Sequence, residues 1–314
     1  MAAAAALAER ARPLSSPNPG VGAIIVKDGV VVGRGWTQPG GRPHAEAMAL
    51  EDAGEAANGA TAYVTLEPCA HQSPRGPSCA SLLAASGIAR LVYGIEDPDP
   101  RTAGAGIAML KDRGVDCVQV ESDAVRESLA GHLMQLSEGR SHVTLKLAMS
   151  LDGCIAMANG ESQWITGETA RAHTHRERAR ADAILVGGET LRSDNPRLNV
   201  RLGGLENRSP RKLVLTRGNA SEGWEAVKSP EAIRDLADAR YLFIEGGAGA
   251  ASAFLEADLV DRLLIYRAPI LIGGGRAGVS DFGLGSLQSA HGRWRPESCL
   301  TLGEDRLEIY TRTR

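Results

Sequence analysis

The sequence predicts an α/β protein built from two domains. At 314 residues the chain is longer than one typical domain and suits two. Segments with a strand pattern alternate with segments with a helix pattern through both halves, and this alternation is typical of α/β layers. A polar, glycine-bearing stretch at residues 138–141 interrupts the alternation. We therefore place the boundary there and expect domains at residues 1–140 and 141–314.

Local signals predict the elements of the first domain. Asp28-Gly29 is a strong tight-turn signal and predicts a hairpin. Pro43 suits the first turn of a helix, where a missing N–H costs nothing, and Asp123 can cap a helix that runs to about Ser137. The other elements expected here are an N-terminal alanine-rich helix, helices at 44–51, 79–85 and 106–113, and strands at 21–26, 30–33, 61–66, 91–95 and 115–120.

Two glycine-rich turns follow strands in the second domain, at residues 187–188 and 245–250. Such a turn before a helix suits phosphate, because backbone N–H groups and the helix dipole face the anion. One turn alone is more often a tight connection, but two at strand ends in one domain indicate a dinucleotide cleft. The strands expected in this domain lie at 143–148, 183–186, 212–216 and 241–244, and a helix runs from the second turn to residue 257.

The composition narrows the classes of function. Aromatic residues make up 4% of a chain that is 43% hydrophobic, so the cores must be aliphatic. The formal net charge of −3 argues against a nucleic-acid-binding surface, which normally shows clustered Lys and Arg. No apolar run approaches about 18 residues, so we expect no transmembrane helix, and the N-terminal alanines lack the basic start of a signal peptide. Five cysteines in a chain of this length fit a reducing cytoplasm, and we interpret Cys117, Cys154 and Cys299 as packing residues.

A cluster of metal-ligating residue types indicates the chemistry of the first domain. His44 and Glu46 stand two residues apart, and Cys69 and Cys79 follow a predicted strand. On a helix the side chains of His44 and Glu46 point in different directions, so one can bind metal while the other stands beside it. Three protein ligands leave a fourth position for water, as in catalytic zinc sites, and zinc lowers the pKa of that water. This pattern is the signature of zinc-dependent nucleobase deaminases, with the glutamate as proton shuttle.

The cysteines also have a structural interpretation when each is taken alone. A free Cys is commonly a buried packing residue, but coincidence explains poorly the order of His, Glu, strand and two Cys. Many deaminases have two residues between the cysteines, whereas nine separate Cys69 from Cys79. The loop between them therefore has some other task.

Single residues of the second domain leave two interpretations open. Lys146 lies in an otherwise apolar strand, and an edge charge is the simpler explanation than a functional group. Trp164 could stack on a ring or simply pack. Arg178 and Arg201 could grip a phosphate in fork geometry or lie on the surface.

With these residues in place, the chain resembles the bifunctional deaminase–reductase family of riboflavin biosynthesis. The resemblance runs from about Pro17 to the C-terminus. In the first half it is carried by Asn18-Pro19-x-Val21-Gly22, His44-Ala-Glu46, Thr65-Leu-Glu67-Pro68-Cys69-x-His71, Pro77-x-Cys79 and Asp97-Pro98. In the second half it is carried by Lys146-x-x-x-Ser150-Leu-Asp152-Gly153, Gly160-Glu-Ser-Gln-Trp-Ile-Thr166, Asp194-x-Pro196 and Glu245-Gly-Gly. So many motifs in the right order make the match specific.

The resemblance implies a cytidine-deaminase-like three-layer domain followed by a dihydrofolate-reductase-like α/β domain. The first domain would use Zn²⁺ to deaminate 2,5-diamino-6-(5-phosphoribosylamino)pyrimidin-4-one. The second would use NADPH to reduce the ribosyl group of 5-amino-6-(5-phosphoribosylamino)uracil to ribityl. The implied partner is a small phosphorylated pyrimidine, with no nucleic acid and no membrane, and a homo-oligomer is compatible with these expectations.

The resemblance also implies roles for individual residues. The zinc ligands would be His44, Cys69 and Cys79, with Glu46 as proton shuttle, and the deaminase substrate would meet Asn18, His71 and Arg75. In the reductase domain Lys146 would position the sugar, with Asp152 nearby. The implied NADPH contacts are Met149, Trp164, Thr190, Asp194, Gly247, Ala248, Gly249 and Ala250. The implied substrate contacts are Ser162, Arg178, Leu198, Arg201 and Glu245.

Three features depart from the family pattern. Thr37 stands where the family often has His, and Asp99 stands where it often has Asn. The segment 200–241 is short, which leaves the 2′-phosphate of NADPH without an assigned partner. Arg217, just past the predicted strand 212–216, is one candidate for that contact.

Two other classes of function share part of this pattern. A nucleoside or nucleic-acid deaminase with an accessory domain would use the same zinc chemistry, but the acidic charge balance and the phosphate-suited second domain disfavour it. A zinc-stabilised or nucleotide-sensing protein without catalysis would not need Glu46 beside the metal.

Overall fold

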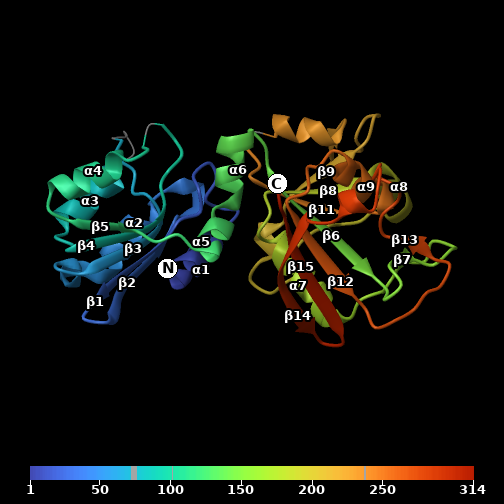
Figure 1. Ribbon diagram of the computed structural model, residues 1–314, viewed down its shortest axis with the longest axis horizontal. Helices are drawn as coiled ribbons and strands as arrows, with labels where there is room; N and C mark the ends of the chain where they lie inside the picture. The colour runs from blue at the N-terminus through green and yellow to red at the C-terminus, as the bar shows by residue number, and fades with distance from the viewer. Residues whose placement is uncertain (72–75, 101, 237) are drawn as a thin grey trace. The chain divides into compact units, whose positions relative to one another are not determined.

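The chain divides into two compact units, Met1–Glu138 and Gly139–Arg314. The computed structural model describes residues 1–71, 76–100, 102–236 and 238–314 (Figure 1). The first unit ends at Glu138 rather than at residue 140, where we placed the boundary. Arg140 accounts for the difference, because its guanidinium donates to both carboxylate oxygens of Asp261 in the second unit, at 2.7 and 2.9 Å.

The first unit is built on a five-stranded mixed sheet. Its described helices are α1 (Ala2–Ala11), α2 (Ala45–Ala53), α3 (Cys79–Ala85), α4 (Ala105–Asp112), α5 (Asp123–Ser128) and α6 (Ala130–Glu138), with 3₁₀ turns at Pro39–Gly41 and Gly54–Ala57. Its strands are β1 (Gly22–Lys27), β2 (Val30–Trp36), β3 (Thr61–Leu66), β4 (Arg90–Ile95) and β5 (Asp116–Gln119). Their order is β2-β1-β3-β4-β5. β1 is antiparallel to β2 and β3, whereas β3, β4 and β5 run parallel. The predicted hairpin at Asp28-Gly29 is confirmed.

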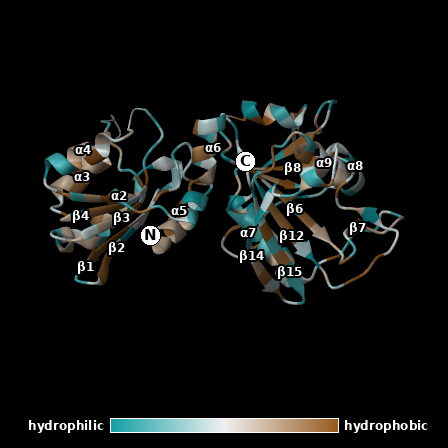
Figure 2. Cartoon of the chain, in the orientation of Figure 1, coloured by the Kyte–Doolittle hydropathy of each residue, from teal (hydrophilic) through white to brown (hydrophobic). Residues whose placement is uncertain are grey.

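Helices cover both faces of this sheet. Successive residues of a strand point to opposite faces, so Ile24 packs with Ala4 and Leu7 of α1. Its neighbour Ile25 belongs to the core cluster that contains Ala49 of α2. Figure 2 shows that the strands between the helices carry mainly hydrophobic residues. The predicted three-layer arrangement is confirmed.

Glycines let α1 and α2 approach the sheet closely. A Cβ atom at Gly22 would lie 1.9 Å from the carbonyl oxygen of Ala4, and one at Gly35 would lie 2.1 Å from that of Ala45. Any side chain at either position would therefore push a helix away from the sheet. Because Ala45 directly follows His44, the contact at Gly35 also holds the start of α2, where the first candidate zinc ligand lies.

One predicted helix of the first unit is two helices. The helix expected from Asp123 to about Ser137 is interrupted at Leu129, between α5 and α6. The N-cap is Ser122, whose Oγ accepts from the N–H of Val125 at 3.3 Å. The predicted cap at Asp123 is therefore wrong by one position, because a serine just before it bonds the free N–H of the first turn.

The second unit is built on an eight-stranded sheet. Its strands are β6 (His142–Met149), β8 (Ala183–Gly187), β9 (Arg211–Leu215), β10 (Glu225–Val227), β11 (Tyr241–Glu245), β12 (Arg262–Arg267), β14 (Trp294–Leu302) and β15 (Asp305–Arg312); β7 (Cys154–Ala156) and β13 (Arg276–Ala277) form a separate pair. Its described helices are α7 (Glu168–Arg178), α8 (Gly188–Asp194) and α9 (Ala248–Glu256), with 3₁₀ turns at Glu206–Arg208, Pro230–Asp235 and Gln288–Ala290.

The strand order in this sheet is β10-β9-β8-β11-β6-β12-β15-β14. The strands from β10 to β12 run parallel to their neighbours, whereas β15 is antiparallel to both β12 and β14. Parallel strands joined through helices are what the alternating pattern predicts, so the α/β class is confirmed for this unit as well.

Lys146 lies in the middle of the eight-stranded sheet. β6 has β11 on one side and β12 on the other, so the interpretation of Lys146 as an edge charge is wrong. Its partners in register are Glu245 of β11 and Leu264 of β12. Leu145 and Leu147 pack into one core cluster, whereas Lys146 faces the other side of the sheet, which α7 covers. A charge at this depth requires a partner.

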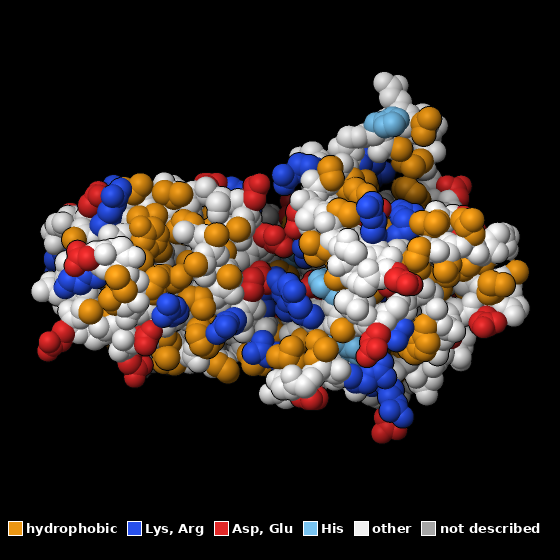
Figure 3. All heavy atoms as spheres, turned by 90° about the horizontal axis from the view of Figure 1, so that it is seen from below, with side chains coloured by type: hydrophobic (Ala, Val, Ile, Leu, Met, Phe, Trp, Pro, Cys, Tyr) orange, Lys and Arg blue, Asp and Glu red, His pale blue; other side chains and the backbone are white. Residues whose placement is uncertain are grey.

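The surface of the chain corrects one further expectation. Cys154 is buried and Cys117 is half-buried, as expected of packing residues, but Cys299 is exposed, because it lies on the outermost strand β14. Acidic and basic side chains are interspersed over the face drawn in Figure 3. Among the described residues, none of the helices has both the length and the apolar character needed to span a bilayer.

Candidate active sites

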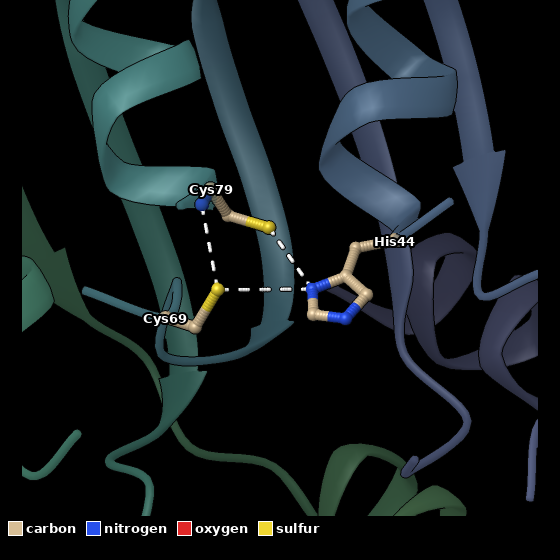
Figure 4. A group of neighbouring side chains, drawn as sticks. All are labelled: His44, Cys69 and Cys79. Atoms are coloured by element: carbon tan, nitrogen blue, oxygen red, sulfur yellow. Dashed lines mark hydrogen bonds between the residues drawn. The ribbon is translucent and has the colours of Figure 1, made fainter. Parts of the chain in front are cut away.

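His44, Cys69 and Cys79 converge in the first unit (Figure 4). Their ligand atoms all lie within 4.8 Å of one another. Nδ1 of His44 lies 3.2 Å from Sγ of Cys79 and 3.7 Å from Sγ of Cys69. Tetrahedral zinc with ordinary Zn–N and Zn–S bonds would place such atoms about 3.5 Å apart. The three side chains therefore fit one zinc ion in both donor type and spacing.

Two helix N-termini bring these ligands together. His44 is the N-cap of α2, and Cys79 is the first residue of α3. Cys69 lies in the loop after β3, and its Sγ accepts from the N–H of Cys79 at 3.4 Å. Hydrogen bonds from Cys79 and His44 lower the pKa of the Cys69 thiol, although burial opposes them. Both sulfurs lie at the start of α3, where the helix dipole favours the thiolate that binds zinc.

Glu46 lies in the first turn of α2 and is 4% exposed. Burial raises the pKa of its carboxyl, and the nearby His44 opposes that rise. A carboxyl whose pKa is raised by burial is a stronger base than an exposed one, which suits a group that must take up a proton during the reaction. The residue expected to shuttle protons is thus held beside the three ligands in a dry environment.

Asn18 contacts the nitrogen of His44 that does not face the sulfurs. Its Nδ2 lies 3.0 Å from Nε2 of His44 and donates to the carbonyl oxygen of Gly41 at 2.8 Å. Partners on the outer nitrogen of a metal-binding imidazole fix the orientation of the ring. We expected Asn18 to contact substrate, and the structure adds a contact with a candidate zinc ligand.

Glu67 is a residue of this site that the sequence analysis did not single out. It is 3% exposed and precedes Pro68-Cys69 in the chain. Its carboxylate oxygens accept four backbone N–H groups, at distances between 3.0 and 3.4 Å, from Asp97, Gly104, Gly106 and Ile107. The side chain therefore ties the start of α4 to the strand end that delivers Cys69. The available signal was an acid at the end of an apolar strand, next to the cysteine motif.

Three further residues of the first unit were named from the sequence: His71, Arg75 and Thr37. His71 is exposed in the loop beyond Cys69, and Arg75 lies outside the described residues. Their contacts with substrate stay predictions. Thr37, which stands where the family often has His, is buried, and its Oγ1 accepts from the N–H of Val21 at 2.9 Å. Its hydroxyl thus stabilises the fold around the β1 strand.

A cavity of about 780 Å³ opens in the second unit at the carboxyl ends of the parallel strands. Both glycine-rich turns line it, as residues 186–190 after β8 and 245–250 after β11, and it reaches Leu215 at the end of β9. Ligands bind in this position in open α/β sheets. The predicted residues on its wall are Ser162, Arg178, Thr190, Asp194, Leu198, Glu245, Gly247, Ala248, Gly249 and Ala250. The size and the backbone N–H groups of the turns suit a dinucleotide.

A buried ionic group lies at one end of this cavity. Glu245 accepts from Nε and Nη2 of Arg178 at 2.5 and 2.9 Å, and Nζ of Lys146 lies 3.8 Å from the same carboxylate. Burial alone would raise the pKa of Glu245, but Arg178 and Lys146 hold it below its ordinary value. Burial lowers the pKa of Lys146. The fork of Arg178, one candidate for gripping phosphate, is therefore engaged by Glu245, and Lys146 adjoins the cavity through this carboxylate.

Tyr266 and His173 complete the surroundings of Lys146, and the sequence analysis named neither. Nζ of Lys146 lies 5.9 Å from the ring centroid of Tyr266, whose hydroxyl lies 2.8 Å from Nδ1 of His173. Burial lowers the pKa of His173 to about 4, so this histidine is neutral near pH 7. Lys146 is thus held between an aromatic face and a carboxylate. A histidine on the polar helix α7 was the sequence signal for this pair.

Two predicted reductase residues lie away from the cavity wall and make contacts within the chain. Asp152 accepts from Oγ of Ser150 at 2.5 Å and from the N–H groups of Ile272 and Gly273 at 3.2 and 2.8 Å. These hydrogen bonds, that of Ser150 foremost, lower the pKa of Asp152 to about 2. Arg201 lies against His175, with Nε 3.4 Å from Nε2 of the ring. The contacts of Asp152 are those of a carboxylate that fixes the turn after β6.

Two predicted NADPH contacts lie elsewhere in the same unit. Trp164 lines a second hollow, of about 490 Å³, and the guanidinium of Arg171 lies 4.8 Å from its ring centroid. Met149 ends β6 and is 8% exposed in the core. Their roles toward the cofactor stay predictions.

The fold and the two sites define a two-domain enzyme, with a zinc-dependent deaminase centre in the first unit and a reductase cavity in the second. The family described as the cytidine and deoxycytidylate deaminase zinc-binding region matches residues 1–95, and the RibD C-terminal domain matches residues 141–307. The chain belongs to the RibD family of riboflavin biosynthesis, whose members combine a zinc-binding deaminase domain with a reductase domain that uses NADPH.

Relatives match over most of their length. The chain is 42% identical over 282 residues to the riboflavin biosynthesis protein RibD of Corynebacterium ammoniagenes, covering 84% of this chain and 83% of the relative. It is 38% identical over 328 residues to that of Escherichia coli K12, covering 89% of each. Among solved structures, Acinetobacter baumannii RibD has a TM-score of 0.84 at 34% identity, covering 99% of this chain and 97% of that one.

A second solved structure carries the name of both activities. The diaminohydroxyphosphoribosylaminopyrimidine deaminase/5-amino-6-(5-phosphoribosylamino)uracil reductase of Thermotoga maritima has a TM-score of 0.87 at 29% identity, covering 99% of this chain and 97% of that one. These relatives match the chain across both predicted domains. The chain is a bifunctional deaminase and reductase.

Proposed function

We propose that the first unit deaminates 2,5-diamino-6-(5-phosphoribosylamino)pyrimidin-4-one and that the second reduces the ribosyl group of the product, 5-amino-6-(5-phosphoribosylamino)uracil, to ribityl. The observation that carries this proposal is the buried Glu46 beside His44, Cys69 and Cys79. A purely structural zinc would need no proton-transferring group next to it. The name of the Thermotoga maritima relative supports the choice of substrates.

In the deaminase unit, His44, Cys69 and Cys79 would hold zinc, which supplies the Lewis acidity that activates water for hydrolysis. Glu46 accepts the proton released by that water and passes it to the leaving amino group. Its burial matters, because a carboxylate with a raised pKa is a stronger base and takes up the proton of the water more readily than an exposed carboxylate would. Asn18 holds the ring of His44 in place.

In the reductase unit, NADPH bound in the cavity would supply the hydride that reduces the sugar. Lys146, on the central strand β6, positions the sugar. Its Nζ lies 3.8 Å from the carboxylate of Glu245, which holds it in place. Arg178 fixes the carboxylate of Glu245 through two hydrogen bonds. Ser162 and Leu198 also line the cavity and would contact the substrate, while the turn at 247–250 would bind the cofactor phosphates.

Further residues are expected to contact the phosphorylated part of the substrates. His71 and Arg75, in the loop between the two cysteines, would meet the phosphoribosyl group of the deaminase substrate. Arg201 would do so in the reductase unit. We also propose a cytoplasmic location, supported by five cysteines that form no disulfide bond in the described chain.

Replacement of Glu46 tests the deaminase assignment. We expect Glu46→Gln to retain zinc but to lower the deamination rate by about 10²–10⁴-fold, because the amide cannot transfer the proton. Reduction of the deaminated intermediate, supplied directly and followed by NADPH oxidation, should be unchanged. Zinc is measured by elemental analysis of the same samples.

Glu51→Gln is the matched control, because Glu51 lies on the same helix and is exposed. It should leave both activities unaltered. Loss of zinc in Glu46→Gln would make Glu46 a ligand and would overturn the assignment. Deamination at the normal rate in that variant would remove Glu46 from the mechanism altogether.

A further inference from the structure

The cavity of the second unit has two chemically different ends. One end, at β11 and β6, holds the buried group of Lys146, Arg178 and Glu245. The other end is marked by Leu215, the last residue of β9. In the sheet, β8 and β11 lie between β9 and β6, so the ends are about 14 Å apart at the usual strand spacing. An extended dinucleotide with its reacting ring at the first end therefore places its adenosine near the end of β9.

Arg192 lies at this second end. The position that a Cβ of Gly188 would take is 3.2 Å from Nη1 of Arg192, 3.4 Å from the carbonyl oxygen of Leu215 and 3.7 Å from Cβ of Thr216. Gly188 and Leu215 both line the cavity. The guanidinium of Arg192 thus lies over Gly188, beside the point where β9 ends.

Arg217 lies on the turn that leaves β9. The turn is fixed by two hydrogen bonds to its neighbours: the N–H of Gly218 donates to Oγ1 of Thr216 at 3.2 Å, and Nζ of Lys228 donates to the carbonyl oxygen of Gly218 at 2.5 Å. Arg217 therefore lies two residues beyond Leu215, which lines the cavity, and Lys228 contacts the same turn. The acidic residues nearest in sequence to Arg192 are Asp194 and Glu189, and both line the cavity.

Arg192 and Arg217 lack a partner within the described chain, as does Arg276 on the cavity wall beside Gly160. Both are exposed, and within the described chain neither makes an ion pair or a hydrogen bond. By contrast, Arg178 at the other end is bonded to Glu245, and Arg211 on β9 itself lies 2.8 Å from Asp238. Unpaired guanidinium groups at the rim of an anion-suited cavity are available to a ligand phosphate.

We propose that Arg192 and Arg217 bind the 2′-phosphate of NADPH and thereby set the preference of this reductase for NADPH over NADH. The inference rests on the assignment of the cavity to the dinucleotide. A 2′-phosphate offers up to two negative charges and three acceptor oxygens, which match two guanidinium forks. The 2′-hydroxyl of NADH offers neither, so both arginines discriminate between the two cofactors without touching the reacting ring.

The test measures binding and turnover of both cofactors. For the full-length chain, dissociation constants of NADP⁺, NAD⁺ and 2′,5′-ADP are measured by calorimetry. We expect Arg217→Ala and Arg192→Ala each to weaken NADP⁺ and 2′,5′-ADP about 10-fold, and the double variant about 50-fold or more. NAD⁺ binding should change by less than about 3-fold, and the weakening should appear in turnover as a rise in KM for NADPH.

Arg306→Ala is the matched control, because Arg306 is also exposed but lies on β15, on the other side of β6. It should leave the ratio of NADP⁺ to NAD⁺ affinity as in the parent chain. Equal weakening of NADP⁺ and NAD⁺ in the double variant would overturn the proposal, and so would an unchanged ratio. A parent chain that binds neither NADP⁺ nor NAD⁺ would instead overturn the assignment of the cavity itself.

Discussion

The zinc centre and the reductase cavity differ in how far apart along the chain their parts lie. His44 and Cys79 are 35 residues apart, and Cys69 lies between them, 10 residues before Cys79. In the cavity, Arg178 and Glu245 are 67 residues apart, and the wall draws on residues from Leu147 to Ser280. The first site is a local assembly, and the second exists only once the sheet has its final strand order.

This difference has a physical origin. Each candidate zinc ligand is placed by a short-range feature: His44 by the N-cap of α2, Cys79 by the first turn of α3, and Cys69 by the loop after β3, where its Sγ accepts from the N–H of Cys79. Metal binding would then couple to the folding of these segments. The cavity has no such organiser within the chain. The side chains of Lys146, Arg178 and Glu245 are only 11–18% exposed, and each charge is stabilised there by its partner.

The most severe test of the local assembly removes one thiolate. We expect Cys69→Ser to lose zinc to background level and to lower deamination by at least about 10³-fold, because the hydroxyl stays protonated and the metal supplies several kcal/mol of stabilisation to the transition state. Reduction of the deaminated intermediate should stay within about 2-fold of the parent chain. Zinc content and both activities are measured on one preparation.

Cys117→Ser is the control for the loss of a thiol in the same unit, because Cys117 is half-buried on β5, away from the three ligands. It should keep zinc and both activities. If Cys69→Ser also abolished reduction, the two sites would not be separable, and the contrast between a local and a long-range assembly would lose its meaning.

The second test concerns the reductase cavity, whose parts lie far apart along the chain. We expect Lys146→Ala to lower kcat/KM for reduction by about 10²-fold or more while sparing deamination. The side chain proposed to position the sugar is then missing, and Glu245 is left with Arg178 as its ion-pair partner. The measurement is NADPH oxidation with the deaminated intermediate supplied directly. Lys212→Ala is the control, because Lys212 lies on β9 of the same sheet, separated from β6 by β8 and β11. Normal turnover in Lys146→Ala would remove this lysine from the site.

The local features were therefore predictable from sequence. The three candidate ligands, the glutamate beside them and the hairpin at Asp28-Gly29 each depend on neighbours within a few residues or on a motif of fixed order. The glycine-rich turns of the second unit were predictable for the same reason, and both lie on the cavity wall. Helix capping was less predictable, because Ser122 and Asp123 compete for one position and side-chain geometry decides between them.

What could not be predicted depends on strand order. The pattern of its own strand predicts an edge charge at Lys146, but the residue is central because β11 and β12, much later in the chain, flank β6. The partners of Glu67 were equally unpredictable, since the four N–H groups that donate to it belong to a segment about 30 to 40 residues away. Sequence pattern identifies which residues are buried and polar, but their partners follow from tertiary pairing.

The smallest expected effect concerns a long-range ion pair that anchors the second unit. Arg140 and Asp261 are 121 residues apart, and both are nearly fully buried. Burial would raise the pKa of Asp261, but Arg140, His142 and the N–H of Val143 lower it from 3.8 to about 2. The folded pKa is thus below the unfolded value, so the stabilisation is fully present above about pH 4 and is lost as the pH falls toward 2.

Asp261→Asn should therefore unfold more easily by about 2 kcal/mol at pH 7, and the difference from the parent chain should shrink as the pH falls below about 4. Urea unfolding followed by tryptophan fluorescence at pH 7, 5 and 3 measures this, because Trp164, Trp224 and Trp294 all lie in the second unit and only Trp36 lies in the first. Zinc content and deamination should be unchanged at pH 7, since the first unit does not contain the pair. A destabilisation that stays constant from pH 7 to pH 3 would mean that the loss comes from packing rather than from the charge of Asp261. Lys146 would then be the remaining example of a charge in the second unit whose role depends on partners distant in sequence.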